Sequence, residues 1–233
     1  MVRGNDVTEG SARAFRARTA CGVVAGPAFV SAFTAIGARR AGYDWRRYAV
    51  SSLADGPEGR TQRANFMIAG ALYCVAARGL TRCPQKIAGP SVVPTIILAA
   101  GVGLIGSGVF VTDPVAGFPP AEQAPDGISA PGAPTRAGTL HNLCAIPIFA
   151  GIPLAALACA GSAAGGREYR WATYCAGSAI GTTGTFALFG VAFGGGAPRL
   201  AGRAGVFQRI SIATGFGWLS ALSLRGLRAS RHA

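Results

Sequence analysis

The stretch IILAAGVGLIGSGVFV, residues 96–111, is apolar or small at every position and carries no charge. It lies within a longer uncharged segment that extends from Lys86 to Asp113. A helix that crosses the hydrocarbon of a bilayer needs about 20 mostly apolar residues. The sequence therefore predicts a transmembrane helix over Ile87–Val111.

Five further runs have the same character, and each is close to the length that a bilayer requires. They are Thr19–Ala38, Ala64–Leu80, Leu140–Gly161, Trp171–Gly194 and Val206–Leu224. We predict an all-α fold, a polytopic membrane helical bundle with six transmembrane helices. The bundle is expected to occupy residues 19–225, with a basic N-terminal tail over 1–18 and a basic C-terminal tail over 226–233. The least secure span is 64–80, because it is short and contains Arg78.

The composition agrees with a membrane protein. Only 13% of the 233 residues are charged, against about 25% in soluble domains. The net charge is +13, but the Arg residues lie between the apolar runs, where they anchor helix ends at the membrane border. This placement argues against nucleic acid as a partner. The six cysteines form no CxxC or Cys/His spacing typical of zinc, so we expect no metal and no cofactor.

The orientation of the bundle is predicted from the loops. With the N-terminus inside, twelve Lys/Arg residues lie on the inner side and ten on the outer side, and the inner side normally carries the excess. We expect a multi-pass protein of the cell membrane with both termini cytoplasmic. The first run is preceded by basic residues, as the apolar region of a signal peptide is. It is longer than a signal peptide requires and Arg39-Arg40 follow it at once, so we expect a retained helix.

An even number of spans places the first, third and fifth loops on one side of the membrane. Most of the unusual polar residues belong to these loops or to the helix ends that they join. We expect one polar pocket on this face, with these candidate residues: catalytic Asp113, His141 and Arg209, and ligand-binding Ser51, Ser52, Asn65 and Gln208.

Three of these residues allow a functional and a structural interpretation. Arg209 needs an anionic partner near the membrane, for which Asp113 is the nearest candidate, or it extends to the interface. His141 is suited to proton transfer because its ordinary pKa lies near neutrality, or it bonds a loop carbonyl at a helix start. Asp113-Pro114 alternatively ends a helix in a turn. Asp113 and His141 alone are too few ligands for a metal.

The loops and packing motifs carry further expectations. The segment YDWRRYAVSSLADGPEG, residues 43–59, predicts a short helix that lies on the membrane surface or folds over the mouth of the bundle. The Gly/Pro-rich stretch from Asp113 to Gly138 predicts an irregular loop. Small residues four apart are typical of close helix packing in lipid; the pairs are Gly70/Cys74, Gly103/Ser107 and Gly177/Gly181.

Four segments together resemble a known family. They are YAVSSLADGPEGRTQRANFMIAG (48–70), GSGVFVTDPVAGFPP (106–120), GTLHNLCAIPIF (138–149) and AGVFQRISIATGFGWL (204–219). Their order and spacing resemble the bacterial and archaeal integral-membrane family catalogued as domain of unknown function 998. The resemblance implies a multi-helix membrane protein without an established activity. Its recurring positions correspond to Ser51, Ser52, Asn65, Asp113, Pro114, His141, Gln208 and Arg209.

The sequence departs from the family at Asn142, where an acidic residue often follows the histidine. This departure weakens the interpretation of His141 as part of a His–carboxylate dyad. No GxSxG, HExxH, Walker A or Rossmann fingerprint occurs. We therefore expect a protein that binds a membrane lipid or small amphiphile. A membrane-embedded enzyme acting on a lipid or isoprenoid-like substrate, with His141, Asp113 and Arg209 at its site, is the alternative. A small transporter is the second alternative, and the sequence leaves oligomeric state open.

Overall fold

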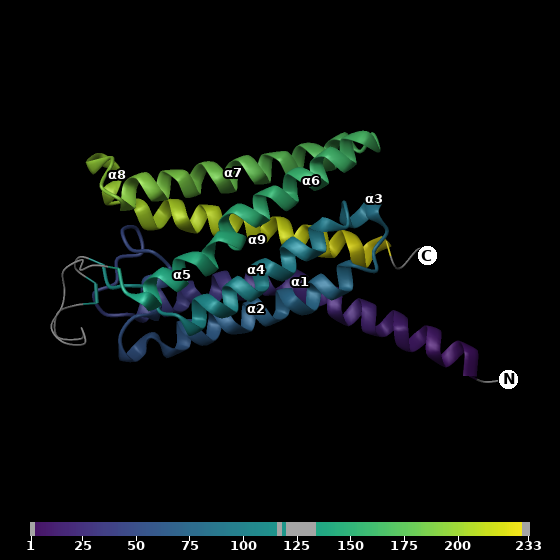
Figure 1. The fold of residues 1–233 in the computed structure, drawn as a ribbon, viewed down its shortest axis with the longest axis horizontal. Helices are drawn as coiled ribbons and strands as arrows, with labels where there is room; N and C mark the ends of the chain where they lie inside the picture. The colour runs from purple at the N-terminus through teal and green to yellow at the C-terminus, as the bar shows by residue number, and fades with distance from the viewer. Residues whose placement is uncertain (1–2, 116–117, 120–133, 230–233) are drawn as a thin grey trace.

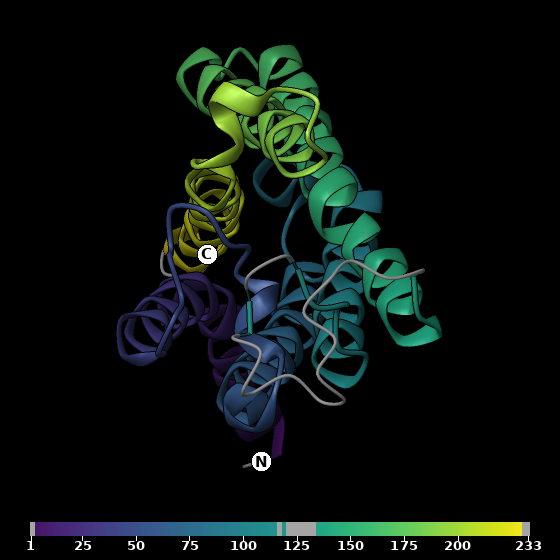
Figure 2. The same ribbon diagram turned by 90° about the vertical axis from the view of Figure 1, so that its left-hand side faces the viewer.

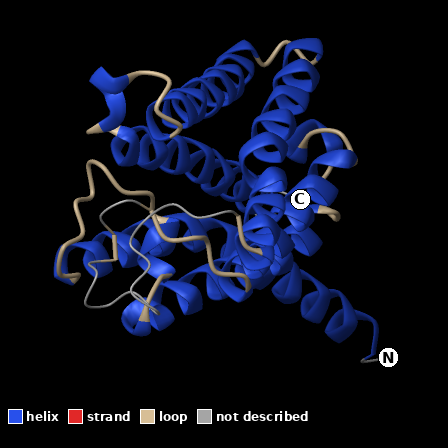
Figure 3. Cartoon of the chain, turned by 60° about the vertical axis from the view of Figure 1, so that its left-hand side comes forward, coloured by secondary structure: helices blue, strands red, loops and turns tan. Residues whose placement is uncertain are grey.

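The computed structural model describes residues 3–115, 118–119 and 134–229. These residues form helices and connecting loops, and none of them belongs to a strand (Figure 3). The predicted all-α fold is therefore confirmed. The middle of the predicted loop between Asp113 and Gly138, and the chain ends at 1–2 and 230–233, lie outside the described residues.

Each predicted run corresponds to a long helix or an unbroken helical segment. The long helices are α1 (Arg3–Arg39), α2 (Arg60–Leu80), α4 (Val92–Val109), α5 (Arg136–Ile146), α6 (Ile152–Gly165), α7 (Tyr169–Phe193) and α9 (Ala204–Ala229). Short elements join them: η1 (Ser51–Ala54), η2 (Pro57–Gly59), α3 (Gln85–Ala88) and α8 (Pro198–Ala201). A π-helical segment, η5 (Pro147–Gly151), links α5 to α6 without a break.

Two predicted boundaries are different in the structure. The run 87–111 is not one helix, because Gly89 has a positive φ of 82° that ends α3 and Pro90 follows it. The transmembrane helix therefore begins only at Val92. The residues 3–18 assigned to a basic tail are helical and continuous with the first span, and the described part of the second tail, 226–229, extends α9.

The long helices pack as a ring. In Figure 2 the order around it is α1, α2, α4, the α5–α6 segment, α7 and α9, which returns to α1. Neighbouring helices of the ring are in contact, and the continuous α5–α6 segment contacts α4 on one side and α7 on the other. The large buried side chains that face inward include Phe29, Tyr73, Phe216 and Trp218. The core therefore lies at the centre of the ring.

The outer surface of the ring is apolar, as a lipid-facing surface requires. Four described helical segments are long and apolar enough to cross a membrane: Gly10–Arg39, Val92–Val109, Arg136–Gly165 and Tyr169–Phe193. Helices α2 and α9 are as long but less apolar, because they carry several Arg residues. Both still expose large apolar side chains, such as Ile68 at 61% and Ile210 at 45%. The count of six spans remains a prediction.

The three odd-numbered loops lie at one end of the bundle, on the left in Figure 1. They are residues 40–59, the described parts of 110–135, and residues 194–203. We call this the odd-loop end. The start of α1 and the end of α9 lie at the opposite end. Polar residues that are far apart in the sequence are therefore brought to one end of the ring.

Candidate functional site

The first loop folds over the mouth of the bundle and does not lie on the surface. The residues Ser52, Leu53 and Ala54 of η1 are buried. The backbone N–H of Val50 donates to Gln208 Oε1 at 2.7 Å, which ties the loop to α9. Of the two arrangements that the sequence allowed, the structure contains the one in which the loop closes the bundle end.

Arg209 anchors this loop. Its guanidinium donates to the backbone oxygens of Tyr48 and Gly205, both at 3.0 Å, and to the Tyr43 hydroxyl at 2.5 Å. The guanidinium also lies 5.7 Å from the ring centre of Phe33, a distance typical of a cation–π contact. The expected ion pair with Asp113 is absent from the described residues. Its acceptors come from the first loop and from the preceding turn of α9.

Asp113 instead joins the end of α4 to the start of α5. Its carboxylate accepts from the Thr135 hydroxyl at 2.5 Å and from the Thr135 N–H at 3.2 Å. Thr135 is the N-cap of α5, and its hydroxyl oxygen accepts from the N–H of Gly138 at 3.0 Å. An N-cap of this kind satisfies a backbone donor that the helix leaves unpaired. Asp113 thus fixes where α5 begins.

His141 lies just over one turn after that start and is 5% exposed. Its Nδ1 is 2.9 Å from the backbone oxygen of Phe110 at the end of α4. Because a carbonyl oxygen only accepts, Nδ1 carries the proton in this bond. The ring packs edge-on against Phe66, with centroids 6.2 Å apart. His141 therefore makes the carbonyl bond expected of a structural role.

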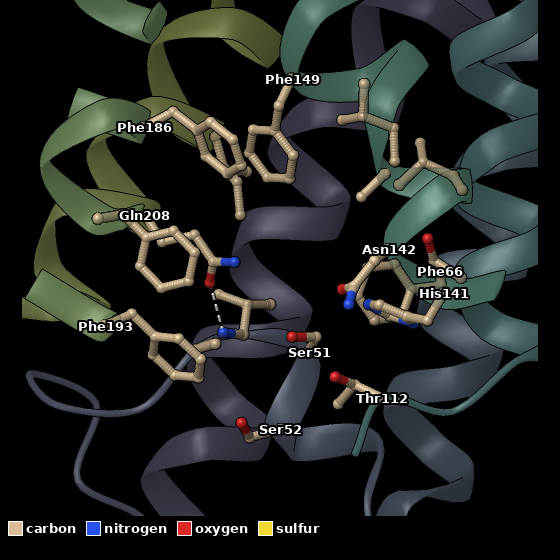
Figure 4. Close-up of a pocket in the computed structure, with 18 of the residues that line it drawn as sticks. Ser51, Ser52, Phe66, Thr112, His141, Asn142, Phe149, Phe186, Phe193 and Gln208 are labelled. Atoms are coloured by element: carbon tan, nitrogen blue, oxygen red, sulfur yellow. Dashed lines mark hydrogen bonds between the residues drawn. The ribbon is translucent and has the colours of Figure 1, made fainter. Parts of the chain in front are cut away.

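A cavity of about 270 Å³ lies beneath the first loop, between α5–η5, α7 and α9. Figure 4 shows Phe149 and Phe186 at its inner end, and Ser51, Thr112, Asn142 and His141 closer to the odd-loop end. The two Phe rings stack with centroids 3.9 Å apart and planes inclined by 9°. Further aromatic lining residues are Phe29, Phe66, Phe189, Phe193 and Phe216.

The cavity reaches the surface where α5 begins and α7 ends. Asn142 and Phe193 line it although both are exposed, Phe193 by 46%. A second, more open cavity of about 400 Å³ adjoins it there and shares both residues. Arg47 and Asp113 line that outer cavity. An inner aromatic chamber is thus connected to an outer vestibule that has charged walls.

The structure brings together some of the predicted site residues and separates others. Ser51, Ser52, His141 and Gln208 line the inner cavity. Asp113 lies at the vestibule. Arg209 and Asn65 line neither, and Asn65 donates to the backbone oxygen of Phe29 at 3.2 Å, joining α2 to α1. The cavity at this end is therefore lined by four of the seven candidate residues, and the role of each in a site stays a prediction.

Several lining residues were missed by the sequence reasoning. Phe186, Phe189 and Phe193 are spaced three and four apart, so they share one face of α7, and this spacing was a usable signal. Phe149 lies in the π-helical segment at Pro147, an irregularity often found at functional sites. Ser107 was interpreted only as a small packing residue, and Thr112 carries no motif.

Two hydroxyls of the cavity wall have no hydrogen-bond partner in the described structure. They belong to Ser52, which is 1% exposed, and Ser107, which is 2% exposed. The side chain of Gln208 uses its oxygen for Val50, and Figure 4 shows its nitrogen directed into the cavity. An unpaired buried polar group costs about 1–3 kcal/mol. The wall therefore offers hydrogen bonds to an occupant.

A buried carboxyl closes the odd-loop end beside the site. Asp55 is 3% exposed, and its Oδ2 has no partner among the described residues. The Arg40 guanidinium donates to the backbone oxygen of Asp55 at 2.9 Å and to Glu58 at 3.0 Å. Burial raises the pKa of Asp55 to about 8, although the charge of Arg40 lowers it. Asp55 is therefore largely protonated at neutral pH.

The described residues contain no group of three or more His, Cys, Asp or Glu side chains that could hold a metal ion. In the comparisons with known proteins, the model of the family described as "Protein of unknown function (DUF998)" matches residues 23–225. No curated protein and no solved structure matches the chain.

Proposed function

The chain belongs to the DUF998 family, and we propose that it binds a membrane lipid or small amphiphile in the cavity at the odd-loop end. The observation that carries the proposal is the division of the cavity wall. The inner end is aromatic, whereas the end below the first loop adds hydroxyl, amide and imidazole groups to the aromatic rings of Phe66 and Phe193. A molecule with an apolar body and a polar tip complements both ends. Small-molecule sites typically combine such apolar walls with a few polar groups.

Lipid access is consistent with the position of the opening. Phe193 and Asn142 stand at the edge of the ring between the ends of α7 and α5. An amphiphile entering there would leave the bilayer chain-first and bring its polar end to rest beneath the first loop. The expected partners are therefore membrane lipids.

A cavity-filling variant tests the proposal. Ala145→Phe places a ring into the cavity, whereas Ala150→Phe on η5 faces outward and serves as the matched control. Native mass spectrometry of the mildly solubilised protein should detect a bound amphiphile in the wild type and in Ala150→Phe. It should detect none in Ala145→Phe at the same thermal stability. An empty wild-type protein, or equal retention in both variants, would contradict the proposal.

An enzyme acting on a lipid or isoprenoid-like substrate is the second candidate. It is favoured by one observation: the imidazole of His141, a side chain suited to proton transfer, lines the cavity. Asp113 lies at the adjoining vestibule, but Arg209 would bind no anionic group there because the first loop occupies it. A His141→Gln variant that binds the amphiphile but no longer converts it supports this candidate. If the cellular lipids of strains that produce the wild type and the His141→Gln variant are the same as those of a strain without the protein, the enzyme candidate is contradicted.

A further inference from the structure

The described lining of the inner cavity carries no fixed charge. None of its described lining residues is Asp, Glu, Lys or Arg, although the chain carries a net charge of +13. The one ionisable group in the wall is His141, and its Nδ1–H is already committed to the backbone oxygen of Phe110. Arg209 is bonded to Tyr43 and Tyr48 and does not line the cavity.

A charged ligand group would therefore enter the cavity without a counter-charge. Removing an ion from water is costly unless a partner of opposite charge and further hydrogen bonds compensate for it. Sites that bind phosphate or carboxylate supply Arg or Lys, commonly in a bidentate arrangement. Among the described residues that line the two cavities, Arg47 in the vestibule can make such a pairing, and it faces the same space as Asp113.

The wall does supply the groups that an uncharged polar function needs. Ser52 and Ser107 have unpartnered hydroxyls, which both donate and accept. The amide nitrogen of Gln208, whose oxygen already accepts from Val50, adds a donor. Donors and acceptors of this kind match a hydroxyl, an ester or an amide, each of which carries no charge at neutral pH.

We infer that the ligand of the inner cavity presents an uncharged hydrogen-bonding group, and that it belongs to the class of long-chain alcohols and neutral acyl esters or amides. The inference rests on the proposed function and names its ligand class. Ionised head groups, such as the phosphate of a lysophospholipid or a long-chain ammonium, are excluded from the inner cavity by the absence of a counter-charge.

The test compares three probes with the same oleyl chain: oleyl alcohol, oleyl phosphate and oleylamine. They compete in one sample for delipidated full-length protein near pH 7, with native mass spectrometry as the readout. The alcohol should bind about tenfold or more tightly than either charged probe. The inference is overturned if the phosphate or the amine binds as tightly as the alcohol. Binding of none of the three would instead contradict the proposed function itself.

Substitution of one hydroxyl provides the second arm. Ser107→Ala should weaken binding of oleyl alcohol by about three- to tenfold, because one hydrogen bond is lost, and should leave the binding of oleyl phosphate unchanged. The matched control is Ser178→Ala on α7, a buried serine that does not line the cavity. If Ser107→Ala does not fold, Ser52→Ala makes the same test. Equal affinities of the wild type and the cavity variant for the alcohol would count against the inference.

Discussion

At the scale of single residues, the guanidinium of Arg209 is hydrogen-bonded to uncharged oxygens of the chain itself. Its three acceptors come from Tyr43, Tyr48 and Gly205, two of which precede it by more than 160 residues. Sequence reasoning identified Arg209 as unusual because a charge beside the hydrocarbon is costly. It could not identify the acceptors, since two of them are backbone oxygens, which every residue carries.

Arg209→Met is expected to lower the free energy of unfolding by roughly 1.5–3 kcal/mol, as for other lost bonds to a charged group. The first loop loses its main tie to α9, so a lower thermal midpoint in detergent should accompany faster proteolysis within residues 40–59. Arg199→Met is the control, because Arg199 is exposed on α8. Equal midpoints for the two variants would show that Arg209 does not anchor the loop.

Asp55 gives the protein a predicted pH dependence. Its pKa is about 8 when folded and lies near 3.8 when unfolded, so the folded state holds a proton that the unfolded state has lost. Its stabilising contribution is therefore complete below about pH 4 and is lost as the pH rises toward 8.

The thermal midpoint of the wild type should accordingly fall between pH 5 and pH 8, and Asp55→Asn should flatten this decline. Glu58→Gln is the control, because the Glu58 side chain is 61% exposed. A wild-type midpoint that rises over this range, or an Asp55→Asn profile identical to that of the wild type, would contradict the assignment.

At the scale of elements, apolar run length predicted the long helices well, and local geometry was predicted less well. Helix α7 lies within two residues of the predicted run at each end. The break between α3 and α4 was missed, because hydropathy does not register the positive φ of Gly89. A proline within a helix indicates a kink, but a sequence pattern does not show that the segment at Pro147 becomes π-helical, since it does not reveal how the freed backbone groups find partners.

Close packing of α2 on α4 is a testable property of these elements. A side chain at Gly70 would collide with the backbone of Gly101 and with Ile105, whereas the position of Gly177 is open. Gly70→Val should therefore destabilise the protein by about 1–3 kcal/mol or more, and Gly177→Val should be nearly neutral. Thermal unfolding of both variants measures the difference, and similar losses in both would refute the packing of α2 against α4.

At the scale of the whole molecule, the alternating direction of successive helices brings the candidate site residues to one end of the bundle. The prediction that the odd-numbered loops share one end follows from an even number of antiparallel helices, and the described structure has this arrangement. Parity does not determine which residues at that end face inward. Ser51 and His141 line the cavity while Asn65 faces α1, and only the packed ring makes this distinction.

Six spans predict opposite sides for successive loops. In a cysteine-free background, Trp45→Cys and Arg203→Cys should react with an impermeant thiol reagent from outside the cell. Thr81→Cys and Gly166→Cys should react only after permeabilisation, because both termini are expected to be cytoplasmic. All four positions are exposed in the structure. Labelling of positions 45 and 81 from the same side would show that α2 does not cross the membrane.

The most direct test of the account is a density map of the wild-type protein purified in lipid nanodiscs. The account predicts an elongated non-protein feature in the inner cavity, with its apolar part beside Phe149 and Phe186 and its polar end within hydrogen-bond distance of Ser107 or Ser52. A cavity that holds only isolated waters, or one that its own aromatic side chains have closed, would contradict the account.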